Sequence, residues 1–76
     1  MKRTPKSRLR DVFAKNVRLA RAERGISQET LALEAGVNRT YLSAVERSEQ
    51  NISLDNVYRL AEALGIPAWQ LLKDVE

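Results

Sequence analysis

The chain has 76 residues and a mass of 8.6 kDa, which is the size of one small domain. It contains neither cysteine nor histidine, which excludes a disulfide framework, a thiol or imidazole metal site and a histidine general base. The longest run without charged or strongly polar residues, 63–69, is far shorter than the ~20 residues that cross a bilayer, and the basic start is not followed by the apolar stretch of a signal peptide. We therefore expect a cytoplasmic protein that is not an enzyme and that needs no metal or cofactor.

Charge is unevenly distributed along the chain. Residues 1–24 carry nine of the 13 basic side chains and two of the 10 acidic ones, so the remainder is net negative although the whole chain has a charge of +3. This asymmetry favours a polyanionic partner at one end of the molecule, and the alternative is a solvated basic helix face without a partner. Residues 1–6 are rich in Lys and Arg and are expected to form a flexible basic arm before a domain comprising residues 7–76.

Apolar residues recur at helical spacing, and no segment alternates with period two, which predicts an all-α domain of five helices. The first helix is expected to begin near Ser7 and to end at Gly25, which takes the left-handed conformation of a helix end. Its apolar stripe consists of Leu9, Phe13, Val17 and Ala20.

The second and third helices are separated by a very short turn. Ser27 is a good N-cap for a helix that runs to about Ala35 and ends at Gly36, and Asn38 caps a third helix over residues 39–47. A turn of three residues forces the two helices to cross steeply, which is the geometry of a helix-turn-helix.

Residues 48–51 are polar and are expected to form a loop. Ser53 then caps a fourth helix that ends at Gly65, and its predicted inner stripe is Leu54, Val57, Leu60, Ala61 and Leu64. Pro67 suits the first turn of a short fifth helix. The apolar side chains of this last segment are Trp69, Leu71, Leu72 and Val75.

The most specific pattern lies in residues 28–47. Its apolar positions, which would hold the second and third helices at a fixed angle, are Leu31, Ala35, Val37, Leu42 and Val45. Ala32 is small because the third helix crosses against it, and Gly36 supplies the positive φ of the turn. A helical hairpin chosen at random would seldom combine all of these features.

With these motifs the chain resembles the lambda-repressor-like, Cro/C1-type helix-turn-helix regulators of bacteria and phages, the XRE family. The resemblance covers about residues 9–73. It rests on the segments 24–28, 31–32, 35–37, 41–43, 45–46 and 60–66. The segments 38–41, 45–47 and 51–54 look most like the small controller proteins of restriction–modification systems, although Ser48 stands where a glycine is common and Gln50 where many controllers have an arginine.

The resemblance implies a set of DNA contacts. The side chains facing the major groove would be Arg39, Thr40, Ser43 and Ala44, and those reaching phosphates would be Gln28, Tyr41, Arg47 and Asn51. Arg39 is the strongest candidate for specificity, because a guanidinium can donate two hydrogen bonds to guanine. For Tyr41, a phenol that reaches a phosphate and one that packs beneath the third helix remain alternatives.

Two further sites are expected. The resemblance implies an ion pair between Arg21 and Glu46 that joins the first and third helices. Trp69, Leu72 and Val75 would form a homodimer interface, since a chain of this size has spare apolar surface at its end, or they would complete the core.

The function predicted is that of a sequence-specific, dimeric transcription regulator that binds an inverted repeat in double-stranded DNA and requires neither membrane nor small-molecule ligand. The alternative is an antitoxin-type interaction module for which DNA binding is secondary.

Overall fold

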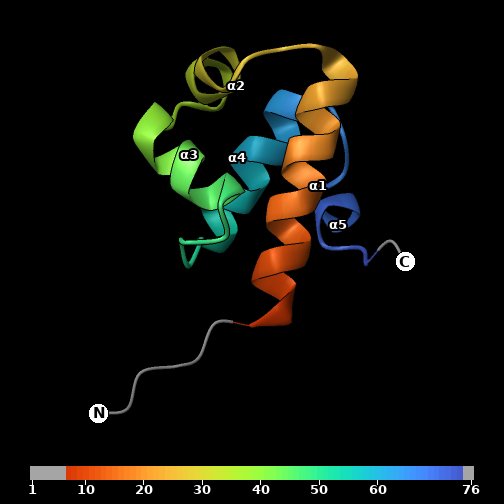
Figure 1. The fold of residues 1–76 in the computed structure, drawn as a ribbon. Helices are drawn as coiled ribbons and strands as arrows, with labels where there is room; N and C mark the ends of the chain where they lie inside the picture. Colours follow the sequence, from red (N-terminus) through yellow and green to blue (C-terminus); the bar gives the residue numbers. More distant parts are fainter. Residues whose placement is uncertain (1–6, 75–76) are drawn as a thin grey trace.

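The computed structural model describes residues 7–74, which form five α-helices and no strand (Figure 1). In chain order they are α1 Arg8–Arg24, α2 Gln28–Ala35, α3 Arg39–Glu46, α4 Leu54–Leu64 and α5 Ala68–Leu71. The all-α, five-helix prediction is confirmed. The predicted basic arm, residues 1–6, and Val75 lie outside the described residues.

Local signals in the sequence set the helix ends. The first four helices each begin after a side chain that accepts a hydrogen bond from a backbone N–H of the first turn, namely Ser7, Ser27, Asn38 and Ser53. Three helices end at glycines with φ between +66° and +73°, which are Gly25, Gly36 and Gly65. These caps satisfy backbone groups that the helix leaves without partners.

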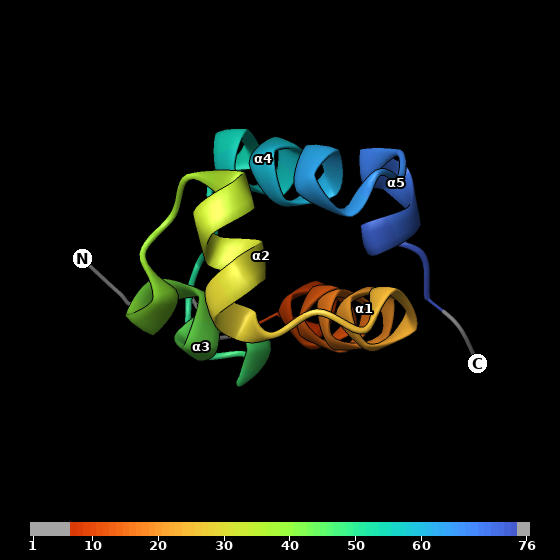
Figure 2. The ribbon, with the colours of Figure 1, turned by 90° about the horizontal axis from the view of Figure 1, so that it is seen from above.

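The helices enclose one apolar core. α2 packs against both α3 and α4, while α1 contacts α3, α4 and α5, and Figure 2 shows α2 lying across the molecule between α3 and α4. The fully buried core side chains include Val17, Leu31, Leu42, Leu60 and Leu71. Ala32 is buried and Val37 packs against the same core, so the pattern in residues 28–47 does fix the crossing of α2 and α3.

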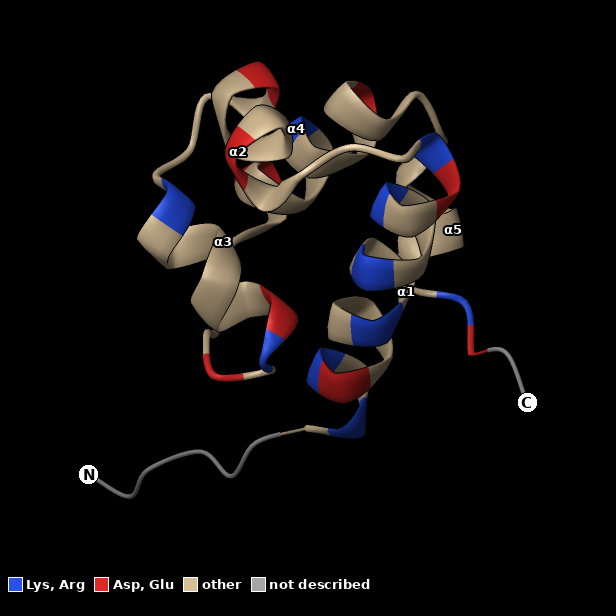
Figure 3. Cartoon of the chain, turned by 45° about the horizontal axis from the view of Figure 1, so that its top comes forward, with Lys and Arg blue, Asp and Glu red and all other residues tan. Residues whose placement is uncertain are grey.

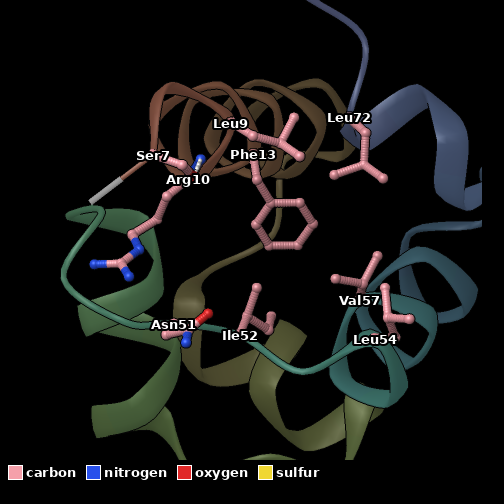
Figure 4. A pocket seen from close by; sticks show the side chains of 9 residues that line it. All are labelled: Ser7, Leu9, Arg10, Phe13, Asn51, Ile52, Leu54, Val57 and Leu72. Atoms are coloured by element: carbon pink, nitrogen blue, oxygen red, sulfur yellow. Dashed lines mark hydrogen bonds between the residues drawn. The ribbon is translucent and has the colours of Figure 1, made fainter. Parts of the chain in front are cut away.

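For two residues of the predicted apolar stripes the expected burial is wrong. Leu54 is 82% exposed and Leu9 is 51% exposed. Both lie in the first turn of a helix, at the edge of the stripe, where few neighbouring elements remain to cover them. They line an apolar pocket of about 150 Å³ between α1, the loop before α4 and α4, with Phe13 at its base and Leu72 at its side (Figure 4).

The last described segment, residues 70–74, is held against α1 by polar contacts. The buried Asn16 amide donates from Nδ2 to the carbonyls of Leu71 and Lys73, at 2.9 and 2.8 Å, and more weakly to that of Gln70. Arg8 forms an ion pair with Asp74. Short α5 is therefore held against α1 by hydrogen bonds to its last carbonyls, the groups that a helix of four residues cannot satisfy itself.

Candidate nucleic-acid interface

Four polar side chains share the outer surface of α3. Arg39, Thr40, Ser43 and Arg47 line a shallow depression of about 160 Å³. The opposite side of α3 buries Leu42, Val45 and Glu46. The helix is thus anchored on one side and presents hydrogen-bonding groups on the other, which is the arrangement needed to read base edges in a groove.

The other residues predicted to contact DNA from this part of the chain lie differently. Ala44 is half-buried and has only a methyl group to offer. Asn51 is exposed in the loop after α3, but it lines the apolar pocket of Figure 4 rather than the depression on α3.

Glu46 is the polar centre on which three helices meet. Its side chain is 3% exposed and accepts hydrogen bonds from Arg21 Nε at 2.8 Å and Arg21 Nη2 at 3.0 Å, and from Gln28 Nε2 at 2.9 Å. The hydrogen bond with Glu46 raises the pKa of Arg21, so the guanidinium stays charged at neutral pH. The structure thus pairs Arg21 with Glu46 across α1 and α3.

Gln28 and Tyr41 are both engaged with other helices. The donation from Gln28 to Glu46 fixes the amide at the start of α2. Tyr41 packs against the core with its ring, and its hydroxyl oxygen accepts a hydrogen bond from Asn56 Nδ2 of α4 at 3.0 Å. The phenolic proton remains available for donation to a phosphate, so packing and a phosphate contact are compatible for this side chain.

Much of the positive charge on α1 is used within the fold. Figure 3 shows Lys and Arg distributed along α1 and at both ends of α3, with acidic residues on α2. Arg18 donates to the backbone carbonyl of Glu46, and Arg24 pairs with Glu34 and donates to the carbonyl of Ala63. Charge counting alone assigns these arginines to a polyanion, whereas the structure uses them to join helices.

Three polar contacts, two of them near the site and one at α5, were missed by sequence reasoning. Arg47 pairs with Glu49, Ser48 donates to Asp11 of α1, and Asn16 caps α5. For Ser48 a signal existed in the resemblance described above, since Ser48 stands where the resembled controller pattern commonly has a glycine, and its φ is +63°.

Of the residues predicted for the dimer interface, Trp69 is 60% exposed, whereas Leu72 is half-buried and packs against the core. Trp69 therefore offers apolar surface that the monomer leaves uncovered. Within residues 7–74, no helix has the length and apolar character needed to cross a bilayer.

The sequence pattern of a helix-turn-helix family matches residues 17–68, which include α2, the turn and α3. The chain belongs to this family. Membership confirms the resemblance that its motifs indicated.

A hypothetical transcription factor from Neisseria meningitidis serogroup B is 55% identical over 64 residues, which are 84% of this chain and 60% of the relative, so the chain spans less than two thirds of that protein. The crystal structure of a hypothetical transcription factor from Neisseria has a TM-score of 0.86 at 47% identity, covering 97% of this chain and 85% of that one.

Controller proteins are also similar. Control protein C.BamHI of Bacillus amyloliquefaciens is 42% identical over 65 residues, which are 84% of this chain and 80% of the relative. The structure of C.Esp1396I bound to a 19 base pair DNA duplex has a TM-score of 0.79 at 26% identity, covering 86% of this chain and 87% of that one.

Proposed function

We propose that this chain is a sequence-specific, homodimeric transcription regulator that reads the major groove of DNA with α3. The observation that carries the proposal is the grouping of Arg39, Thr40, Ser43 and Arg47 on the outer side of a helix whose other side is buried. The similarity to controller proteins, including C.Esp1396I bound to DNA, supports the same assignment. The chain would act in the cytoplasm, where the DNA that it binds is located.

Each group has a role that follows from its chemistry. Arg39, exposed at the first position of α3, donates two hydrogen bonds to guanine, and Thr40 donates one or places its methyl group against thymine. Ser43 and the methyl group of Ala44 complete the base contacts. Phosphates are contacted by Gln28, Tyr41, Arg47 and Asn51, which fix the register of the protein on the duplex without reading the sequence.

A second copy of the chain is required by the size of this surface. One recognition helix contacts ~3–5 base pairs, too few to select one site among the ~10⁶ or more positions of a genome. A closed two-fold dimer presents two α3 helices about one helical turn apart, ~34 Å, so the operator is an inverted repeat with half-site centres ~10 base pairs apart. Trp69, Leu72 and Val75 supply the interface, of which Trp69 is the exposed anchor.

The test is selection of bound duplexes from a random DNA library, followed by measurement of Arg39→Ala on the selected duplex and on a random one. Loss of the guanine contacts should weaken binding to the selected duplex by ~1–3 kcal/mol and relax the preference at one base pair per half-site. The matched control is Arg59→Ala, which removes an exposed arginine from α4. Equal losses by Arg39→Ala on both duplexes would show that Arg39 contacts only phosphate.

A further inference from the structure

Arg47, at the trailing end of α3, is held by two neighbours on the candidate DNA-binding surface. Its Nε donates to Glu49 Oε1 at 3.1 Å, and Nη2 lies 3.1 Å from the same oxygen. Its Nη1 donates to Ser43 Oγ. The guanidinium proposed to reach a phosphate and the hydroxyl proposed to reach a base are therefore both engaged within the protein.

The backbone fixes Glu49 in this place. Ser48 follows α3 with a φ of +63°, and its N–H donates to the carbonyl of Val45 at 3.0 Å, while the N–H of Glu49 donates to that of Ala44 at 2.9 Å. These two bonds are the Schellman motif of a helix end. The Ser48 hydroxyl also donates to Asp11 of α1, so Glu49 projects from an anchored turn.

A carboxylate at this position is unfavourable for both the helix and DNA. The C-terminal end of a helix carries partial negative charge and favours cations, and phosphates repel a nearby carboxylate. What offsets this is the pair with Arg47, whose side chain is 54% exposed while that of Glu49 is 59% exposed. Ion pairs between side chains this exposed contribute little to stability, so a phosphate can replace the Glu49 carboxylate as partner of Arg47.

We infer that Glu49 is an intramolecular competitor for the phosphate that Arg47 contacts, and that it sets the affinity of the α3 surface for DNA. This inference rests on the proposed function. In the free protein the Glu49 carboxylate binds the Arg47 guanidinium, which also donates to the Ser43 hydroxyl. On DNA the guanidinium exchanges Glu49 for a phosphate, and the remaining carboxylate lowers affinity for every duplex by repulsion.

The experiment compares Glu49→Gln with the wild type on the duplex selected by the wild type and on a random duplex of equal length, by fluorescence anisotropy at several salt concentrations. The dissociation constant should fall about two- to fivefold on both duplexes, as expected when an exposed pair no longer has to be broken. Folding should be unchanged, because the turn is held by the N–H of Glu49 and not by its side chain.

Two controls separate competition from net charge. Glu62→Gln removes one exposed negative charge from α4 and should change the dissociation constant much less. In an Arg47→Ala background, Glu49→Gln should lower the dissociation constant by a clearly smaller factor than it does in the wild-type background, because the competitor has lost its target and only the repulsion of phosphates remains.

A gain no larger than that of Glu62→Gln, or an equal gain in the Arg47→Ala background, would overturn the competition. If the wild type binds its selected duplex and Arg39→Ala relaxes its preference, such a result leaves the proposed function standing. A wild type that binds neither duplex would overturn both.

Discussion

Replacing Arg21 with alanine should destabilise the fold more than any change at an exposed arginine. The Glu46 carboxylate is 3% exposed and would lose two of the three side-chain hydrogen bonds described above, retaining that from Gln28. Arg21→Ala also removes a donor to the carbonyl of Ile26 at 3.0 Å. A buried carboxylate without its counter-charge is one of the few single-site defects with a large cost.

The expected cost is about 3–5 kcal/mol, the range for breaking a buried pair from one side. A domain of this length has a total stability of ~4–11 kcal/mol, so the variant should be close to unfolding at room temperature. Thermal and urea unfolding followed by circular dichroism would measure this, and the midpoint should fall by more than ~10 °C.

The matched control is Arg24→Ala on the same helix. Arg24 pairs with Glu34 at 3.3 Å, and the two side chains are 40% and 42% exposed, so its loss should cost about 1 kcal/mol or less. Replacing Arg21 and Glu46 together with leucine should recover part of the loss, because no buried charge remains. An Arg21→Ala protein as stable as Arg24→Ala would refute the assignment of Glu46 as a buried, paired carboxylate.

The stability that the Arg21–Glu46 pair contributes should not depend on pH in the neutral range. The pKa of Arg21 is raised by its hydrogen bond with Glu46, and a raised pKa of a base gives stability that is fully present below the ordinary pKa and is lost only as the pH rises through the raised one. Between about pH 6 and 9, far below both values, Arg21 stays protonated in the folded and unfolded chains and adds no slope.

Three other changes test the remaining features. Asn16→Ala should cost about 1–3 kcal/mol in urea unfolding, because carbonyls at the end of α5 lose their buried donor. Ser48→Ala should be less stable than Ser48→Gly by about 1 kcal/mol, since both lose the bond to Asp11 but only glycine relieves the positive φ; equal stabilities would contradict the strain. Trp69→Glu should raise the dimer dissociation constant at least tenfold in sedimentation while the monomer keeps its stability, whereas Leu72→Glu should also destabilise the monomer, because Leu72 packs against the core. A Trp69→Glu protein that dimerises as the wild type does would exclude Trp69 from the interface.

The helix boundaries could be predicted because they depend on local chemistry. Ser27 and Asn38 accept N–H groups a few residues ahead, and Gly36 takes a positive φ that other residues resist. The buried positions of α2 and α3 could also be predicted, because the spacing of apolar residues along a helix depends on the local sequence alone. The prediction that Leu54 is buried was wrong, because periodicity gives the face on which a side chain lies but not whether another element covers that end of the helix.

The destinations of the arginines could not be predicted from charge. Arg18 and Arg24 each bind a group from another segment, and such pairs depend on tertiary distances that composition does not contain. A family pattern supplied the single long-range pair that was anticipated, between Arg21 and Glu46. The pair of Arg47 with Glu49 spans two residues, yet it forms only because Ser48 turns the chain back toward α3.

Glu46 also explains how so small a core can hold α3 in one orientation. Apolar contacts of Leu42 and Val45 attract the helix to the core, but the hydrophobic effect is non-directional and allows some rotation about the helix axis. Hydrogen bonds weaken steeply when misaligned, and Glu46 receives them from α1 through Arg21 and from α2 through Gln28. A rotation of α3 that moved Arg39 off its direction would break these bonds in a nearly dry environment, where their loss is most costly. Stability and recognition are therefore coupled at one carboxylate, and substitutions there should change DNA binding through the direction of α3 even though Glu46 itself is too deeply buried to contact DNA.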